Sequence, residues 1–591
     1  MTDKKIFTGG EFLITDASPE QVFTPEDFSE EHRMIHETTK DFVSKEILPI
    51  LHKVDAMDRE TVLGILTKAG ELGLLSTDVP EEYGGLGLDK VSTTVVTEAT
   101  GTTASFTAVY GAHTGIGTLP IVYFGTNDQK TKYLPKLASG EWCGAYALTE
   151  PDAGSDALNA RTNAVLSEDG KHYILNGLKM FVTNGGWANS FIVYAKVDGE
   201  QFTGFIVERD FPGVSTGPEE KKMGMHGSST CSLILEDAKV PVENVLFEIG
   251  KGHKIAFNVL NIGRWKLGAA TVGGCKACVT DAVKYANTRI QFKVPISSFG
   301  MIKTKLANMA ICTYISESMM YRLAGVFDDK LATLDDEAKK SGAENARAIG
   351  EYAAECSITK VYGSESLDYC VDEYVQILGG YGYCAEYAAE RSYRDSRINR
   401  IWEGTNEINR LLIPGTMMRR ALKGRLALFP AAQAIAGELM SYSPLSVQLP
   451  DTPLALQEHM VKMSKKIALM VAGVAAQKFQ KELTHEQEVL GKIADIVIEV
   501  FAMESGLLRA LKAISNDGAG LHVAAVKAYV DEAIPKIEMW AKQALAYVEE
   551  GDMLRTQLAG VKKLARYQPL DAVSVKREIA DRIIELESYP F

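Results

Sequence analysis

The 591-residue sequence lacks several features that would assign it to other protein classes. No stretch approaches the roughly 18 apolar residues that a membrane-spanning helix needs, and the apolar run IALMVAGVAA (467–476) is far too short. The N-terminus, MTDKKIFTGGEFLI, has neither the long apolar run of a signal peptide nor the arginine-rich, acid-poor composition of a transit peptide. We therefore expect a cytoplasmic protein that is at most peripherally attached to a membrane.

Cysteine is scarce, with eight residues scattered along the chain. Only Cys275 and Cys278 form a CxxC motif, and no second pair or histidine lies nearby to complete a metal site. Residues three apart on a helix share a face, so ordinary packing explains this spacing. We expect no bound metal and a reducing compartment.

Basic residues are fewer than acidic ones, 63 against 77, which gives a formal charge of −14. This balance argues against a nucleic-acid partner. The 46% hydrophobic and 24% charged content is ordinary for a globular protein with a large core, and the length predicts several domains.

Residue patterns divide the chain into helical and strand-rich regions, which predicts an α+β fold that is mainly α. One region is rich in β-branched and aromatic residues, as expected of a small antiparallel β-domain. Its turn signals are Asp169-Gly170, Asn176-Gly177 and Asn184-Gly185-Gly186. The expected order is a leader (1–24), an N-terminal helical domain (25–141), the β-domain (142–247), a helical bundle (248–429) and an extra C-terminal helical domain (430–591).

Several individual helices are predicted within these regions. One covers residues 29–51 with Pro49 marking its end, and a second covers residues 59–76. In the bundle, long helices are predicted over residues 260–292, 301–329 and 344–383.

Small side chains follow one face of segment 103–117, at Ala104, Ala108, Ala112 and Gly115. Either this face allows close helix–helix packing, or it is a smooth wall along which a long apolar ligand can pass. The sequence leaves both interpretations open. His113 lies in the same segment and is expected to be an ordinary core or surface histidine.

An internal repeat relates residues 305–324 to residues 492–511 at an offset of 187. Both segments contain the pattern ESxxxR at the same phase. We hypothesise that the C-terminal region is a degenerate copy of the bundle. The same offset carries Glu403 to the end of the chain, so the copy would have no site of its own.

Residues 391–413 (RSYRDSRINRIWEGTNEINRLLI) contain a candidate for chemistry at Glu403, between Trp402 and Gly404. Apolar bulk removes water from a carboxylate and raises its pKa, which makes it a better base near neutral pH. Gly404 permits close approach of another molecule, and Thr405 or Asn406 can cap the following helix. In isolation, a surface turn is the simpler interpretation.

Seven motifs, in order, make roughly residues 25–420 resemble the acyl-CoA dehydrogenase family. They are VPEEYGGLGL (79–88), YALTEPDAGSD (146–156), LNGLKMFVTNGG (175–186), KMGMHGSSTCSLILEDAKVPVENV (222–245), TRIQF (288–292), QILGGYGY (376–383) and RDSRINRIWEGTNEINR (394–410). The family fold is a helical domain, a β-domain and a helical bundle, which matches the order predicted above.

The resemblance implies an FAD site. In similar proteins residues 146–155 line the flavin, and Phe181 and Thr183 lie against its ring, although many relatives carry Trp where this chain has Phe181. Residues near 289–292 and 376–380 would reach the FAD of a neighbouring subunit. The implied cofactor contacts are Tyr146, Leu148, Thr149, Gly154, Ser155, Phe181, Thr183, Arg289, Gln291, Phe292, Phe299, Gln376, Gly379, Gly380, Thr405 and Asn406.

By the same resemblance, Glu403 is the base that removes an α-proton from an acyl-CoA thioester while the β-carbon gives hydride to the flavin. Some family branches place the base on the helix that contains NIGRW, where this chain has Gly263, so Glu403 has no competitor. The implied substrate contacts are Ser155, Asn261, Arg264, Gly404, Ala108 and Ala112.

Finer expectations concern chain length and partners. Ala108 and Ala112 stand where medium-chain relatives carry bulkier polar groups, and the extra C-terminal domain resembles the very-long-chain branch, whose members are typically homodimers. We therefore expect a long-chain acyl-CoA substrate in fatty acid β-oxidation, electron-transfer flavoprotein as acceptor, and a homodimer. Segment 417–429 (MMRRALKGRLALF) fits either packing on the bundle or a peripheral membrane contact.

Two other functions stay open. A flavin acyl-CoA oxidase would pass electrons to oxygen, which the sequence does not distinguish well. A non-catalytic binding protein on the same scaffold would be expected to lose the base and carry a basic surface, whereas this chain has Glu403 and a charge of −14.

Overall fold

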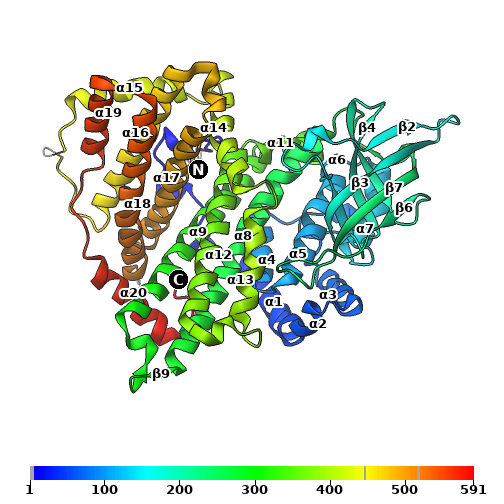
Figure 1. Cartoon of the computed structure of the whole chain (residues 1–591), viewed down its shortest axis with the longest axis horizontal. Helices are drawn as coiled ribbons and strands as arrows, with labels where there is room; N and C mark the ends of the chain where they lie inside the picture. Colours follow the sequence, from blue (N-terminus) through cyan, green and yellow to red (C-terminus); the bar gives the residue numbers. More distant parts are fainter. Residues whose placement is uncertain (1–4, 445–446, 515–518) are drawn as a thin grey trace.

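The computed structural model describes residues 5–444, 447–514 and 519–591, and helices account for most of them (Figure 1). A sheet lies at one end of the molecule, long helices form the middle, and C-terminal helices form the other end. The expected fold class, mainly helical with a small β-region, is confirmed.

The N-terminal helices differ from the predicted ones in where they end. Pro49 does not mark the end of the first helix: α1 ends earlier, at Phe42, and a π-helical turn (Val43–Ile47) follows it. Pro49 lies in the next turn, a 3-10 turn (Leu48–Ile50) where its missing N–H is not needed, and α2 follows directly. The second helix ends at Glu71, since Gly73 has φ +74° and turns the chain away. The helices are α1 (Glu30–Phe42), α2 (Leu51–Asp55), α3 (Arg59–Glu71), α4 (Lys90–Thr100), α5 (Ser105–Gly111), α6 (Leu119–Phe124) and α7 (Asn127–Ala138).

His113 is a buried structural residue, as expected. Its Nε2 lies 2.9 Å from the Leu137 carbonyl oxygen, and the Gly144 N–H donates to its Nδ1. Burial lowers the pKa of His113 to about 4, so the ring is neutral and joins η7 (Ala112–Gly117), a π-helical turn, to the sheet.

The sheet has eight strands in the order β6-β7-β3-β2-β4-β5-β8, with β1 beside β4. It is not purely antiparallel as predicted, because β1 and β2 both run parallel to β4. The strands are β1 (Gly144–Ala147), β2 (Asn163–Leu166), β3 (His172–Thr183), β4 (Ser190–Val197), β5 (Gln201–Glu208), β6 (Val214–Thr216), β7 (Thr230–Pro241) and β8 (Val245–Leu246).

One predicted turn in the sheet is wrong. Asn176-Gly177 lies inside β3, at a register shift in its pairing with β7. The Asn176 side chain accepts from the Asp237 N–H and donates to the Asp237 carboxylate, which satisfies the bulge without reversing the chain. Asp169-Gly170 does connect β2 to β3, and Asn184-Gly185-Gly186 follows the end of β3.

The bundle and the C-terminal region share one continuous apolar core. The predicted helix 260–292 begins earlier and ends at Thr288, and residues 290–295 form a short antiparallel hairpin instead. The predicted 344–383 helix is interrupted near Glu351. The elements are α8 (Gly252–Thr288), β9 (Ile290–Gln291), β10 (Val294–Pro295), α9 (Gly300–Ala332), α10 (Asp336–Lys340), α11 (Gly342–Gly350), α12 (Ala353–Leu378), α13 (Ala388–Ser396), α14 (Asn406–Leu422), α15 (Leu428–Ser441), α16 (Ala455–Phe479), α17 (Gln487–Ile514), α18 (Gly520–Val548), α19 (Gly551–Leu564) and α20 (Ala572–Leu586).

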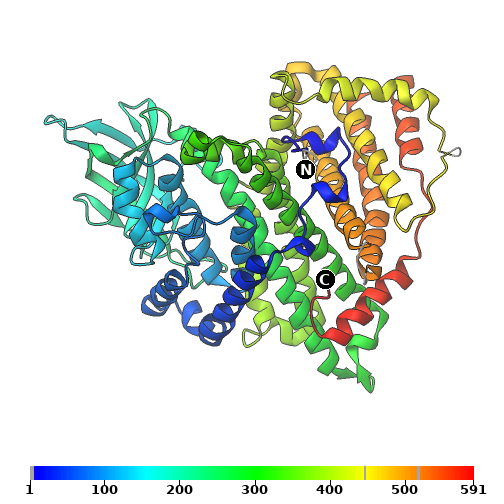
Figure 2. The same cartoon turned by 180° about the vertical axis from the view of Figure 1, so that it is seen from behind.

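The segment expected to be an extended leader is packed against the C-terminal helices. The rings of Phe12 and Phe501 are 4.8 Å apart, and Lys465 donates to the Thr15 carbonyl. Figure 2 shows this blue segment lying across the helices. Burial of Phe12 and Leu13 removes apolar surface from water, which explains why the segment is not a loose leader.

The two repeated segments face each other as α9 and α17. Arg322 of α9 donates to Glu504 of α17 (2.8 Å), and Arg509 of α17 donates to Glu317 of α9 (2.6 Å). Equivalent residues at the repeat offset therefore pair reciprocally, as they would across a two-fold axis. This symmetry favours the hypothesis of a degenerate bundle copy, which stays a prediction until the helices are superposed.

Segment 417–429 is explained mainly by packing. Met417, Ala421, Leu426 and Leu428 are buried, whereas Leu422 is 71% exposed. Among the described residues, no helix is both long enough and apolar enough to cross a membrane.

Replacing Glu504 by Gln is expected to lower the free energy of unfolding by about 3–5 kcal/mol, because the buried Arg322 would lose its carboxylate and the buried Lys465 would keep only the more exposed Asp16. Thermal and denaturant unfolding measure the change. The exposed pair between Lys303 and Asp581 supplies the control, since Asp581→Asn should cost less than about 1 kcal/mol. Equal stability of the two variants would contradict a structural role for the reciprocal pairs.

Candidate active site

The loop that carries Glu403 has an unusual backbone. Glu403 has φ +56° and Gly404 has φ +80°, and the loop leads into α14, whose first turn is capped by Thr405. A non-glycine residue with positive φ is held in place only when its surroundings enforce it. The contacts around this loop are therefore part of the site.

Three side chains hold the carbonyl groups of the loop. Arg264 Nε donates to the Glu403 oxygen at 3.0 Å, and Lys360 Nζ donates to the Gly404 oxygen at 2.8 Å. Asn409 Nδ2 donates to the oxygens of Gly404 (2.8 Å) and Thr405 (3.0 Å). These donors come from α8, α12 and α14, so three helices fix the direction of the Glu403 side chain.

Gly263 provides the space for the Glu403 carboxylate. A Cβ atom added at Gly263 would lie 2.4 Å from Glu403 Oε2. The Glu403 carboxylate therefore requires a glycine at position 263. The same glycine leaves α8 without a base at the alternative position.

The pKa of the Glu403 carboxyl group lies near neutral pH. Desolvation raises its pKa to about 7, and the nearby charges of Arg264 and Lys360 limit the rise. Oε2 is buried and has no hydrogen-bond partner among the described residues. A carboxylate in this environment can accept a proton near neutral pH.

A pocket opens beside Glu403 between α8 and the small-residue face. Ala108, Ala112 and Gly115 line it, whereas Ala104 precedes α5 and does not. Of the two open interpretations, the pocket wall therefore fits three of the four small residues. The other lining residues include Thr97, Thr107, Tyr110, Thr183, Gly263, Lys266, Leu267, Ala270, Asn399 and Trp402.

Lys266 contributes an aliphatic stem to this pocket. Its ammonium is held by Asp78, which also binds Lys90, and the side chains of all three are nearly buried. Pairing with two lysines keeps the pKa of Asp78 low despite burial, so the carboxylate stays ionised. The positive charge of Lys266 is therefore neutralised by Asp78, and the stem of Lys266 is what lines the pocket.

The residues expected to meet the flavin ring form an open surface beside the pocket. Phe181 is 62% exposed with φ +56°, at a register shift in β3, and Thr183, two residues on, lines the pocket together with Glu403. Gly154 and Ser155 are exposed, and a Cβ at Gly154 would meet no atom within 4 Å. An exposed aromatic ring and an unobstructed stretch of backbone are both features that a planar cofactor ring can use.

Buried polar contacts support this surface from behind. Lys179, fully buried, pairs with Glu150 at 2.6 Å, and Glu150 also accepts from the N–H groups of Arg161 and Thr162. The Thr149 carbonyl accepts from the Met180 N–H. Tyr146 and Leu148 are nearly buried in this layer, which leaves a cofactor contact by either one a prediction.

A second group of expected cofactor residues lies elsewhere, near β9 at the lower end of the bundle (Figure 1). Phe292 is 88% exposed and contacts Phe299 with ring centroids 6.0 Å apart, and the Arg289 guanidinium lies 5.4 Å from the Tyr381 ring. The remaining members of this group are Gln291, Gln376, Gly379 and Gly380. Their separation from the Phe181 surface is compatible with contact to another subunit's cofactor, which stays a prediction.

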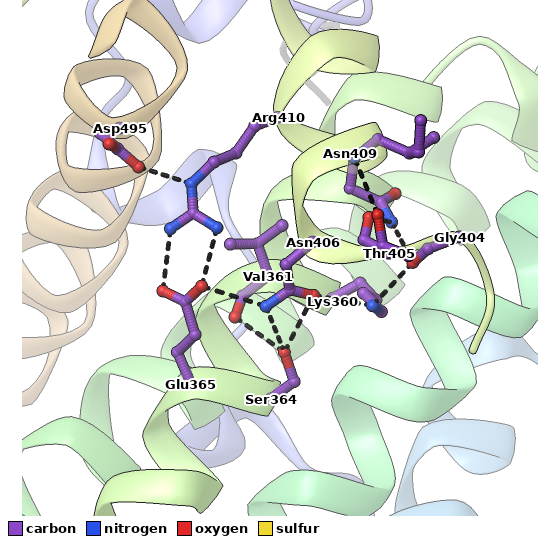
Figure 3. Close-up of polar contacts among 11 residues, drawn as sticks. Lys360, Val361, Ser364, Glu365, Gly404, Thr405, Asn406, Asn409, Arg410 and Asp495 are labelled. Atoms are coloured by element: carbon purple, nitrogen blue, oxygen red, sulfur yellow. Dashed lines mark hydrogen bonds and ion pairs between the residues drawn. The ribbon is translucent and has the colours of Figure 1, made fainter. Parts of the chain in front are cut away.

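Other expected contact residues are engaged within the chain. Thr405 caps α14 by accepting from the Ile408 N–H, and Asn261 accepts from Arg264 at 2.9 Å. Asn406 is 2% exposed, and its amide bonds Lys360, Ser364 and Glu365 (Figure 3). In this chain Asn406 therefore supports the loop from inside, and a cofactor contact by it stays a prediction.

Sequence reasoning missed Lys360 and Asn409. Lys360 lies inside α12, and most of the residues beside it in the sequence are apolar or small. A lysine among such residues was the signal that the sequence offered. Asn409 follows Asn406 by three residues, which places both on one side of α14. No clusters of three or more potential metal-ligating side chains occur in the described part of the chain.

Family models for acyl-CoA dehydrogenases match most of the chain. The N-terminal domain model covers residues 29–141, the middle domain model 145–238, and two C-terminal domain models 250–418 and 463–563. The chain belongs to the acyl-CoA dehydrogenase family.

Individual relatives agree with this assignment. A probable acyl-CoA dehydrogenase of Bacillus subtilis is 53% identical over 585 residues, covering 98% of each chain. A mitochondrial very long-chain specific acyl-CoA dehydrogenase of Macaca fascicularis is 36% identical, covering 84% of this chain and 75% of the relative. The crystal structure of an acyl-CoA dehydrogenase complexed with FAD from Bacillus anthracis superposes with a TM-score of 0.97 at 55% identity, covering 99% of this chain and 100% of that one.

Replacing Gly263 by Ala in this acyl-CoA dehydrogenase is expected to lower kcat by about 100-fold, because the new methyl group would displace the Glu403 carboxylate. Steady-state kinetics with an acyl-CoA and an artificial acceptor measure the effect. The fold should persist, since alanine is favoured inside a helix. Gly415→Ala on α14, where a Cβ meets nothing within 4 Å, is the control, and equal activity of the two variants would argue against the steric account.

Proposed function

We propose that this FAD-dependent acyl-CoA dehydrogenase converts long-chain fatty acyl-CoA to trans-2-enoyl-CoA in fatty acid β-oxidation. The observation that carries the proposal is the desolvated Glu403 carboxylate, with a free oxygen, on the wall of a pocket lined by small side chains. The exposed Phe181 surface beside this pocket and the FAD in the related Bacillus anthracis structure support the cofactor.

Glu403 acts as the base that takes the α-proton of the thioester. A pKa near 7 lets the carboxylate be ionised in a useful fraction of molecules and still accept a proton. The acyl chain displaces the remaining water from the pocket, which raises the proton affinity of Glu403 further.

The thioester carbonyl must be polarised for its α-proton to be acidic enough. Among the described residues, none accepts a hydrogen bond from the Glu403 N–H, so this donor is available to a substrate oxygen. A fixed backbone donor costs no reorganisation during the reaction, and Arg264, Lys360 and Asn409 fix it. When bound, FAD supplies the acceptor for the hydride that leaves the β-carbon.

The small lining residues support a long acyl chain as the substrate. Ala108, Ala112 and Gly115 leave space along one wall, and the aliphatic stem of Lys266, close to Gly115, adds apolar lining. The similarity to a very long-chain specific relative over 84% of this chain supports the same choice.

The acceptor and assembly complete the proposal. Electrons pass to electron-transfer flavoprotein, as the dehydrogenase family membership favours, rather than to oxygen. The exposed Phe292, Met301 and Tyr383 near β9 support a homodimer, because they offer apolar surface to a second copy. All eight cysteines are unpaired, which favours a cytoplasmic, reducing location.

Replacing Glu403 by Gln is expected to abolish dehydrogenation by about 10⁴-fold or more while the protein keeps its yellow flavin, because the amide cannot accept the α-proton. Anaerobic bleaching of the flavin by acyl-CoA measures the step directly. Near-normal bleaching in Glu403→Gln would refute the assignment of the base. The time course of reoxidation in air separates a dehydrogenase from an acyl-CoA oxidase.

Replacing Ala112 by Glu is expected to move the best substrate to shorter acyl chains, because the longer side chain fills the small-residue wall. A rate profile across acyl-CoA lengths with an artificial acceptor measures the shift. Activity on short chains is the internal control and should persist. A wild-type profile that peaks at short chains would refute the long-chain proposal.

A further inference from the structure

A continuous line of polar contacts connects the C-terminal helix α17 to the Glu403 loop (Figure 3). Asp495 of α17 accepts from Arg410 Nε at 2.7 Å, and Arg410 donates to both oxygens of Glu365, at 2.7 and 3.0 Å. Glu365 accepts from Asn406 Nδ2 at 3.0 Å. Asn406 Oδ1 accepts from Lys360 at 2.7 Å, which completes the line.

The spacing on two helices makes this arrangement specific. Lys360 and Ser364 are four residues apart on α12, and Asn406 and Arg410 are four residues apart on α14, so each pair shares one face. The orientation of the Asn406 amide is fixed, because its Oδ1 accepts from Lys360 and its Nδ2 donates to Ser364. A slide of either helix would break several contacts together.

Lys360 is the buried cation of this line that lies closest to Glu403 along the chain of contacts. Its side chain is 0% exposed, and its ammonium bonds only the Gly404 oxygen and Asn406 among the described residues. Glu403, Arg264, Glu365 and Glu407 are the charged groups that act on it. Burial lowers the pKa of Lys360 to about 7, and the carboxylate of Glu403 opposes this shift.

We propose that Lys360 is a positioning residue for Glu403, and that Asp495 of the C-terminal region acts on the same loop through Arg410, Glu365, Asn406 and Lys360. The inference rests on the proposed function of Glu403. It assigns to the C-terminal region a contribution to the site that the region does not contact directly. Glu403 itself is faced by Arg264 from α8, Lys360 from α12 and Tyr146 from β1.

The first test is Lys360→Met, which keeps the length of the side chain and removes its charge and donors. We expect kcat to fall by about 100-fold, because the Gly404 carbonyl is released and the loop can move. Loss of the positive charge also raises the pKa of Glu403, so the rise of kcat/KM with pH moves to higher pH. A merely structural lysine would lower the rate equally at every pH and leave this profile in place.

Infrared difference spectra give a readout independent of turnover. The band of the protonated Glu403 carboxyl, identified by its absence in Glu403→Gln, should titrate at higher pH in Lys360→Met than in the wild type. An unchanged titration would overturn the electrostatic part of the proposal.

A double-mutant cycle tests the connection to Asp495. Asp495→Asn alone is expected to lower kcat by about tenfold with little change in KM. In the Lys360→Met background it should have an effect within about twofold, because its route to Glu403 is already broken. Multiplicative effects of the two substitutions would overturn the connection.

Two controls distinguish a failure of this inference from a failure of the proposed function. Asp581→Asn removes another ion pair of the C-terminal region, with Lys303, and should leave kcat unchanged. If the wild-type protein does not oxidise acyl-CoA, the proposed function fails. If it does and the cycle is multiplicative, only the role of Asp495 fails.

Discussion

Keeping water away from one carboxylate is the constraint on which the rest of this structure depends. Desolvation brings the pKa of Glu403 to about 7, but the same burial would favour any rearrangement that returned the charge to water. A backbone with two consecutive positive φ values has little intrinsic preference for this position. Donors to three successive carbonyl groups therefore fix the loop, and Gly263 leaves the space that the carboxylate needs.

The C-terminal region can be understood from the same constraint. Its helix α17 packs on α9 through reciprocal arginine–glutamate pairs and also reaches α14 through Asp495. Paired buried charges are stable only when their geometry is kept, so they hold the two regions in one register. Under the proposed repeat the region would have no equivalent of Glu403, and we infer that its contribution is to hold the helices that carry this residue.

Much of this could be predicted from sequence because local patterns decide it. The mainly helical fold, Glu403 as the candidate base, the small-residue face and a structural His113 followed from periodicity, composition and resemblance to a family, whereas the burial of His113 did not. The errors arose where tertiary contacts override local signals. Asn176-Gly177 forms a bulge because Asp237 pairs with it across the sheet. Residues 5–24 are packed because Phe12 meets Phe501 of α17 and Lys465 of α16 donates to the Thr15 carbonyl. Lys360 was missed because a lysine in a helix is usually exposed, and only the fold brings Gly404 and Asn406 to it.

The most direct test of the account is the rate of flavin reduction by acyl-CoA under anaerobic conditions, measured as a function of pH. If a desolvated Glu403 is the base, the rate should rise with one ionisation near neutral pH, displaced from the ordinary range of a glutamate. A rate that is constant from about pH 5 to pH 9, or that rises with the pKa of an ordinary exposed glutamate, would contradict it.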